Sequence, residues 1–331
     1  MTSRIQEMLA GKNDVIDYAA VIKKYPWLAQ KNQNCILSPD SDGLLCGLFV
    51  SQYLNWKVKG FYDGKFLILE KGILPRDCIF LDMEIFRNGV KSVGQHMVLF
   101  NKDQIPNNWN NFDDCLSANN IRGYDGKHNF PQKYPLATIH LLLGVIGSVQ
   151  KIGIPKDAIC PLLYTDGTFK NLFNYPDNCL SWLKFLHADN DKSPLHKIFF
   201  NDHYSISSLM LALKELFGEL RLIAGGSRGG DKIKFSNGKG QLINFDTKKQ
   251  SLKKETVDQA EEFLKFLSGK TGWKYNPKVW SWNNLSHFKF EKGSIKPSQG
   301  RYNDLISKNP VSLAMTSTLG IEYTLDPQNI F

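Results

Sequence analysis

The chain has 331 residues, of which 42% are hydrophobic and 22% charged, a composition typical of a folded protein that is long enough for two domains. No apolar run reaches the roughly 18 to 20 residues of a membrane helix, and residues 1–7 lack the pattern of a signal peptide, so no membrane contact is expected. The formal net charge is +9, and residues 221–331 carry 18 Lys and Arg against 10 Asp and Glu. This asymmetry favours a polyanionic partner for the C-terminal third; a solvated lysine-rich surface is the alternative.

Cysteine usage and apolar spacing indicate the compartment and the fold class. None of the six cysteines forms a Cys-x-x-Cys pair and several lie in apolar runs, so we expect buried free thiols in a cytoplasmic protein. Residues 1–30 have apolar positions at helical spacing. Strand-like and helix-like segments then alternate to about residue 186, which predicts an α/β fold with a mostly parallel sheet.

The first strand of this pattern ends in two carboxylates. Residues 35–37 read as a buried strand, Asp40-Ser41-Asp42-Gly43 follows, and the apolar residues after Gly43 predict a helix. Open α/β sheets bind ligands at the carboxyl ends of their strands. Two carboxylates packed there are costly unless a cation or a shared proton relieves them; a solvated acidic turn is the alternative.

Three more strands are expected to deliver polar side chains to the same edge. Residues 78–81 lead to Asp82, residues 93–100 carry His96, and residues 159–165 end at Asp166. Carboxylate oxygens with one imidazole suit Mn²⁺ or Mg²⁺ better than zinc. The pattern therefore predicts a site for one or two such ions, with the ligands Asp40, Asp42, Asp82, His96 and Asp166.

The order of these residues resembles the DHH phosphoesterase superfamily, in particular its RecJ-like members. Tyr134-Pro135 before the expected helix 138–149 resembles a helix entry of that family, and residues 164–169 resemble its last metal-binding segment. The resemblance covers roughly residues 30–185. The family's namesake Asp-His-His triplet falls on Gln95-His96-Met97, so only its central histidine is present.

The resemblance implies a metal-dependent phosphoesterase that acts on single-stranded nucleic acid, short oligonucleotides or a nucleotide. Asp82 would bridge two ions and act with His96 in catalysis, and His128 would replace the missing acid at Met97; His140 is a second candidate, but its apolar neighbours favour a core histidine. Because Gln95 is no anionic ligand and Met97 donates no proton, the main alternative is a catalytically inactive DHH-fold protein that binds nucleic acid or a protein partner. A phosphatase for small molecules is the third.

Two breaks divide the chain into expected domains. Residues 187–194 are polar and turn-rich, and an amphipathic helix follows from Ser205 to Phe217, ended by Gly218. We expect a DHH-like domain over 1–190, a linker and connecting helix over 191–220, and a smaller basic α+β domain over 221–331 that contains a helix at 251–267.

The basic segment offers two candidate substrate contacts. The glycine-rich run 225–230 favours phosphate contact through Arg228, Gly229 and Gly230, with a flexible hairpin as the alternative. Between residues 270 and 302, aromatic rings alternate with cations that include Lys274 and Arg301. Such interleaving suits single-stranded nucleic acid, although ordinary half-buried strands have the same pattern.

Overall fold

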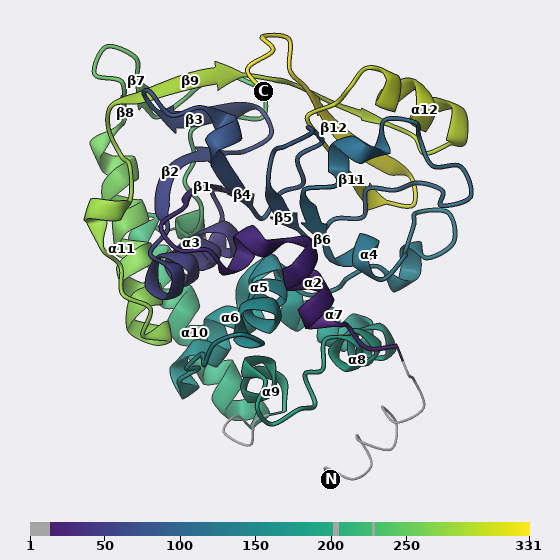
Figure 1. Cartoon of the computed structure of the whole chain (residues 1–331). Helices are drawn as coiled ribbons and strands as arrows, with labels where there is room; N and C mark the ends of the chain where they lie inside the picture. Colours follow the sequence, from purple (N-terminus) through teal and green to yellow (C-terminus); the bar gives the residue numbers. More distant parts are fainter. Residues whose placement is uncertain (1–13, 201–204, 227–228) are drawn as a thin grey trace.

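A seven-stranded, mostly parallel sheet forms the centre of the protein (Figure 1). The computed structural model describes residues 14–200, 205–226 and 229–331. The strand order is β6-β5-β4-β1-β2-β3-β9; the first five strands are parallel, and β3 and β9 are antiparallel to their neighbours. The strands are β1 (Asn34–Leu37), β2 (Lys57–Tyr62), β3 (Phe66–Glu70), β4 (Cys78–Leu81), β5 (Ser92–Gly94), β6 (Cys115–Ser117) and β9 (Leu285–Lys289). The expected α/β fold is thereby confirmed.

Helices cover one face of this sheet, and the C-terminal residues cover the other. In Figure 1, α3, α5, α6, α10 and α11 lie together on one side. The helices are α2 (Tyr18–Lys24), α3 (Ser41–Leu54), α4 (Ala118–Ile121), α5 (Thr138–Gly147), α6 (Ile159–Tyr164), α7 (Thr168–Asn174), α8 (Pro176–Phe185), α9 (Pro194–Phe199), α10 (Ile206–Ile223), α11 (Lys254–Thr271) and α12 (Gln299–Ser307). Two small sheets complete the fold: β10 (Glu291–Ile295), β12 (Gly320–Leu325) and β11 (Ser312–Ser317), and β7 (Phe245–Asp246) with β8 (Ser251–Leu252).

Alternation along β1 explains why both faces are covered. Cys35 and Leu37 pack into the cluster formed with the helices, whereas Ile36 packs into a second cluster that includes Phe290 and Val311. Successive side chains of a strand point to opposite faces, so a strand that is apolar at every position is buried on both sides. A short apolar run of this kind is what made β1 and β4 recognisable in the sequence.

The basic C-terminal third is built into the same layers. One buried cluster extends from Ile16 to Leu285 and crosses both boundaries expected near residues 190 and 220. Strand β9 pairs with β3, and residues of α12, β11 and β12 share a third cluster with Phe86 and Met97. The expected linker at 187–194 forms turns that lead into α9. None of the helices in the described residues is long and apolar enough to cross a membrane.

Several expected elements are wrong in type or length. Residues 159–165 form helix α6 and a 3-10 turn instead of a strand, and of the strand expected at 93–100 only Val93 and Gly94 belong to a strand, β5. Helix α10 continues past Gly218 to Ile223, and α11 begins and ends a few residues later than expected. Part of the helical segment expected at residues 1–30 lies outside the described residues; the rest forms α2 and a short 3-10 helix. All six cysteines are buried and unpaired, as expected.

Candidate active site

The turn after β1 places Asp40 at the start of α3. Asp40 caps this helix by accepting a hydrogen bond from the Gly43 N–H at 3.4 Å, and the Ser38 hydroxyl donates to the same carboxylate oxygen at 2.9 Å. A Cβ built on Gly43 would lie 2.1 Å from the carbonyl oxygen of Ser38. Only glycine therefore allows the helix to approach the strand end this closely, which explains the Asp-Ser-Asp-Gly sequence.

Asp42 holds the N-terminus of α5 against the site. Its two carboxylate oxygens accept hydrogen bonds from the backbone N–H groups of Thr138 (2.7 Å) and Ile139 (3.0 Å). These groups have no partner within their own helix, and the helix dipole adds to their attraction for an anion. Asp42 is thus a buried anchor between α3 and α5 as well as a member of the acidic cluster.

Asp82 and Asp166 both occupy left-handed backbone positions. Asp82 follows β4 with φ of 65° and accepts a hydrogen bond from the Thr138 hydroxyl at 2.8 Å. Asp166 has φ of 54° in the 3-10 turn between α6 and α7. Aspartate tolerates this conformation better than most residues, and such backbone strain recurs at functional sites. The turn brings Asp166 to the cluster although no strand precedes it.

His96 is oriented by a carboxylate that sequence reasoning missed. Glu84, two residues after Asp82 and almost fully buried, lies 3.0 Å from His96 Nδ1 and accepts a hydrogen bond from the His96 backbone N–H. A Cβ on Gly94 would lie 2.4 Å from the Glu84 Cδ, so glycine makes room for this carboxylate. The spacing Asp82-x-Glu84 at a strand end was the signal available in the sequence.

The cluster is electrostatically unfavourable without a cation. Burial together with Asp166 and Asp40 raises the pKa of Asp42 from its ordinary 3.8 to about 7. Burial and the neighbouring aspartates also raise the pKa of Asp82, well above 3.8, and burial raises that of Asp166. Burial lowers the pKa of His96, but the Glu84 carboxylate outweighs it and raises that pKa to about 9.

These shifts predict that the metal-free protein loses stability as the pH rises. The pKa of Asp42 is higher in the folded chain than in the unfolded one, so its contribution to stability is complete below pH 4 and is lost as the pH rises through 7. We expect the free energy of unfolding in EDTA to fall by at least ~1.4 kcal/mol over this window, the equivalent of one pKa unit. Denaturant titrations from pH 4 to pH 8 measure it. The Asp82→Asn variant should flatten this pH dependence, whereas Asp304→Asn on exposed α12 should leave it unchanged; equal slopes in all three proteins would contradict the prediction.

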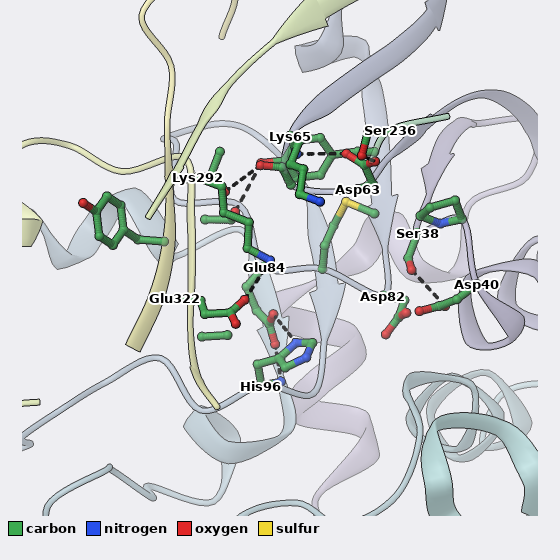
Figure 2. Close-up of a pocket in the computed structure, with 18 of the residues that line it drawn as sticks. Ser38, Asp40, Asp63, Lys65, Asp82, Glu84, His96, Ser236, Lys292 and Glu322 are labelled. Atoms are coloured by element: carbon green, nitrogen blue, oxygen red, sulfur yellow. Dashed lines mark hydrogen bonds and ion pairs between the residues drawn. The ribbon is translucent and has the colours of Figure 1, made fainter. Parts of the chain in front are cut away.

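A cavity of about 530 Å³ opens beside the cluster (Figure 2). In Figure 2, Asp40, Asp82, Glu84 and His96 lie along one side of it, and Lys65 enters from the opposite side. Its lining includes four lysines from three separate segments: Lys65, Lys232, Lys234 and Lys292. Among the lining residues we call Asp40, Asp82, Glu84 and His96 the acidic wall and the four lysines the lysine wall; Asp63 and Glu322 also line the cavity, and Glu322 pairs with Lys292.

Strand-like alternation presents two of these lysines to the cavity. Ile233 and Phe235 are buried, so the intervening Lys232 and Lys234 are exposed, and the Ile233 N–H donates to the Pro39 carbonyl at 2.7 Å. This bond fixes the segment beside the Asp40 turn. Lys292 forms an ion pair with Glu322 at 2.7 Å, and Lys65 donates to the Asn237 carbonyl at 2.9 Å. Three of the four lysines belong to the basic C-terminal third.

The predicted site residues fall into two groups. Asp40, Asp82 and His96 line the cavity; buried Asp42 and Asp166, which is exposed to solvent, interact electrostatically with them but do not line it. The other expected contacts lie elsewhere. Gly229 and Gly230 form a turn against α10, and exposed Lys274 and Arg301 do not line the cavity; Arg228 lies outside the described residues.

His128 and His140, the histidines considered as replacements for the acid missing at Met97, also lie away from the cavity. His128 has both ring nitrogens beside carboxylates, Asp125 at 2.8 Å and Asp103 at 3.4 Å, and it does not line the cavity. His140 is fully buried; it accepts a hydrogen bond from the Ala137 N–H at 3.1 Å, and burial lowers its pKa to about 3. Neither imidazole is placed to protonate a leaving group in the cavity, and His140 instead stabilises the start of α5.

The aromatic rings expected to stack on bases belong to the core. Trp273 packs against Phe49, and Trp280 and Trp282 stack with each other and with Phe61. All three indoles are buried. The indole rings of residues 270–302 therefore serve core packing.

The donor types suit a hard divalent cation. Among the described residues, Asp40, Asp82 and Asp166 form no ion pair with a lysine or arginine, and their mutual repulsion favours a positive charge. Glu84 orients the His96 ring as carboxylates commonly orient metal-ligating histidines. The described side chains include no group of three or more His, Cys, Asp or Glu gathered around one ion position.

Comparison with known proteins adds no relative. No family model, curated protein or solved structure matches this chain. The geometry of the cavity and the order of the aspartates and His96 along the chain are therefore the grounds for a functional proposal.

Proposed function

We propose that this chain is a divalent-metal-dependent phosphoesterase, akin to the DHH phosphoesterases, that hydrolyses short single-stranded oligonucleotides or nucleotides. The observation that carries the proposal is the cavity itself, whose lining brings Asp40, Asp82 and His96 together with four lysines. Carboxylates attract a metal ion and lysines attract phosphate oxygens, so the two walls together suit a phosphate ester held between them.

Each wall has a defined part in the reaction. Asp40, Asp82, Asp166 and His96 would hold one or two Mn²⁺ or Mg²⁺ ions, with Glu84 fixing the His96 ring. Such an ion, when bound, lowers the pKa of a water molecule and neutralises charge on the phosphate. The lysines hold the non-bridging oxygens while the water oxygen bonds to phosphorus and gives up a proton to solvent, the bond to the leaving oxygen breaks, and that oxygen takes a proton from solvent.

A catalytically inactive binding protein is the second candidate. Met97, which occupies the last position of the family's Asp-His-His triplet, is buried in the cluster with Phe86 and Tyr302, and Gln95 is buried beside it. Neither side chain supplies an acid or an anionic ligand. The lysine wall would then bind a polyanion without cleaving it.

Hydrolysis of a labelled single-stranded oligonucleotide separates the two candidates. The wild-type protein is incubated with Mn²⁺, Mg²⁺ or EDTA, and cleavage and binding are followed in parallel. Cleavage that requires the metal supports the phosphoesterase. Tight, salt-sensitive binding without cleavage supports the inactive protein, and the absence of both contradicts the two candidates and favours a small-molecule phosphatase.

The paired lysines next to Asp40 are expected to control substrate affinity. The variant Lys232→Met/Lys234→Met removes two cations from the cavity and keeps most of the side-chain volume. We expect KM to rise about tenfold or more, with kcat changed much less, because phosphate contacts mainly position the substrate. The slope of log affinity against log salt concentration should become shallower by about 1 to 2.

A third lysine provides the control for this double variant. Lys239 lies on the same segment and is exposed, but it does not line the cavity. Lys239→Met should leave KM and the salt slope unchanged. If it weakens binding as much as the double variant does, the attraction comes from overall charge and the cavity is not the binding site.

A further inference from the structure

A second cavity lies on the other side of the β11–β12 hairpin. Its volume is about 440 Å³, within the range of about 300 to 1,000 Å³ common for small-molecule sites. Thr316 of β11 lines both this side cavity and the main cavity. Both spaces therefore border the same residue, which places the side cavity next to the main one.

The side cavity offers one exposed aromatic ring. Tyr175, between α7 and α8, lines it and is 58% exposed. Phe130 lines it as well; it is half-buried against the core, and the Lys133 Nζ stands 4.8 Å from the centre of its ring. An exposed ring and a lysine in one cavity suit a planar base joined to a phosphate, because the ring stacks on the base and the cation attracts the phosphate.

The wall that carries Lys133 is preformed. The Asn178 side-chain amide donates to the Lys133 carbonyl at 2.8 Å, and the Asn171 amide donates to the Pro135 carbonyl at 2.7 Å. Lys133 also lies close enough to the acidic cluster for Asp166 to raise its pKa, although burial lowers it overall, and for its charge to lower the pKa of His96. Lys133 thus stands between the aromatic surface and the residues proposed to act on the phosphate.

We propose that the side cavity binds the nucleoside next to the scissile phosphate, with its base on Tyr175 and the linking phosphate near Lys133, so that the substrate is at least a dinucleotide. This inference rests on the proposed function. It assigns the main cavity to the phosphate end of the substrate and the side cavity to the neighbouring nucleoside. A mononucleotide would leave the aromatic surface unused.

Two substrates test the assignment: a 5′-phosphorylated dinucleotide, and methyl p-nitrophenyl phosphate, a diester without any nucleoside. Tyr175→Ala and Lys133→Met should each raise KM for the dinucleotide about tenfold, the effect of losing one stacked base or one phosphate contact. Hydrolysis of the simple diester by Tyr175→Ala should stay within twofold of wild type. Phe173→Ala is the matched control, since Phe173 is 64% exposed nearby but does not line the cavity.

The outcomes separate the inference from the proposed function. If wild type hydrolyses both substrates and Tyr175→Ala leaves the dinucleotide KM within twofold, the side-cavity assignment is wrong and the phosphoesterase stands. If wild type hydrolyses neither, the phosphoesterase fails, and fluorescence anisotropy with the labelled dinucleotide in Mn²⁺ decides the rest. Tenfold weaker binding by Tyr175→Ala than by Phe173→Ala would support the nucleoside site, and equal or no binding would overturn it.

Discussion

Replacing Asp82 with asparagine is expected to reduce kcat at least about 1,000-fold while the oligonucleotide still binds. Asp82 lines the cavity, lies within the acidic cluster and is held by the Thr138 hydroxyl, so an amide there keeps the shape and removes the charge. Loss of metal-assisted charge stabilisation costs several kcal/mol in the transition state, and each 1.36 kcal/mol is about tenfold in rate. Single-turnover hydrolysis in Mn²⁺ and binding in EDTA separate the two effects.

The same variant should fold at least as well as wild type. Removing one of several buried carboxylates that repel each other relieves the cost that raises the pKa of Asp42. Asp304→Asn on α12 controls for a general change in charge. A kcat within tenfold of wild type, in a protein that hydrolyses the oligonucleotide, would show that Asp82 is not part of the catalytic machinery.

The second large effect is on stability: Trp273→Ala should lower the free energy of unfolding by about 3 to 5 kcal/mol, the usual cost of deleting a buried tryptophan side chain. Trp273 is 1% exposed, and its ring centre lies 5.2 Å from that of Phe49 on α3. Chemical denaturation measures the loss. Any loss of nucleic-acid binding should track the fraction of folded protein.

Lys274, the next residue in the chain, provides a control substitution for Trp273→Ala. Lys274 is exposed, and its backbone N–H donates to the Gln52 side chain, an interaction that a substitution of the side chain leaves in place. Lys274→Ala should change stability by less than about 0.5 kcal/mol. A Trp273→Ala protein that keeps wild-type stability but loses nucleic-acid binding would instead support the base-stacking role that the sequence predicts for this ring.

Apolar runs bounded by turn residues were sufficient to predict the centre of the fold. The strands β1 and β4 and the start of α3 follow from such runs, and so does the position of Asp40 and Asp82 at strand ends. Residues 159–165 have an equally apolar run but form a helix. The sequence could not show this, because a short run that is apolar at every position has no periodicity that distinguishes a helix from a strand. Asp166 nevertheless lies close enough to His96 and Asp40 to interact with them, since the turn after α6 replaces the expected strand end.

The lysine wall was harder to foresee because tertiary packing creates it. Lys232 and Lys234 reach the cavity only because Ile233 and Phe235 are buried and the segment bonds to Pro39, almost 200 residues earlier in the chain. Interleaved rings and cations at 270–302 gave a stronger pattern in the sequence, but there the rings fill the core. Composition located the excess positive charge correctly in the C-terminal third; it did not show which lysines face the site.

The pairing of β9 with β3 has a consequence for how the protein is made. Phe66 pairs with Lys289, more than 200 positions later, and β10 to β12 supply one side of the main cavity. Contacts between such distant segments form slowly, because a long loop must close before they add stability. During synthesis the acidic cluster is translated before three of the four cavity lysines, Lys232, Lys234 and Lys292. Until β9 has been synthesised, β3 is an unpaired edge strand of the central sheet. We expect the nascent chain to be most prone to aggregation, and most dependent on chaperones, at this stage.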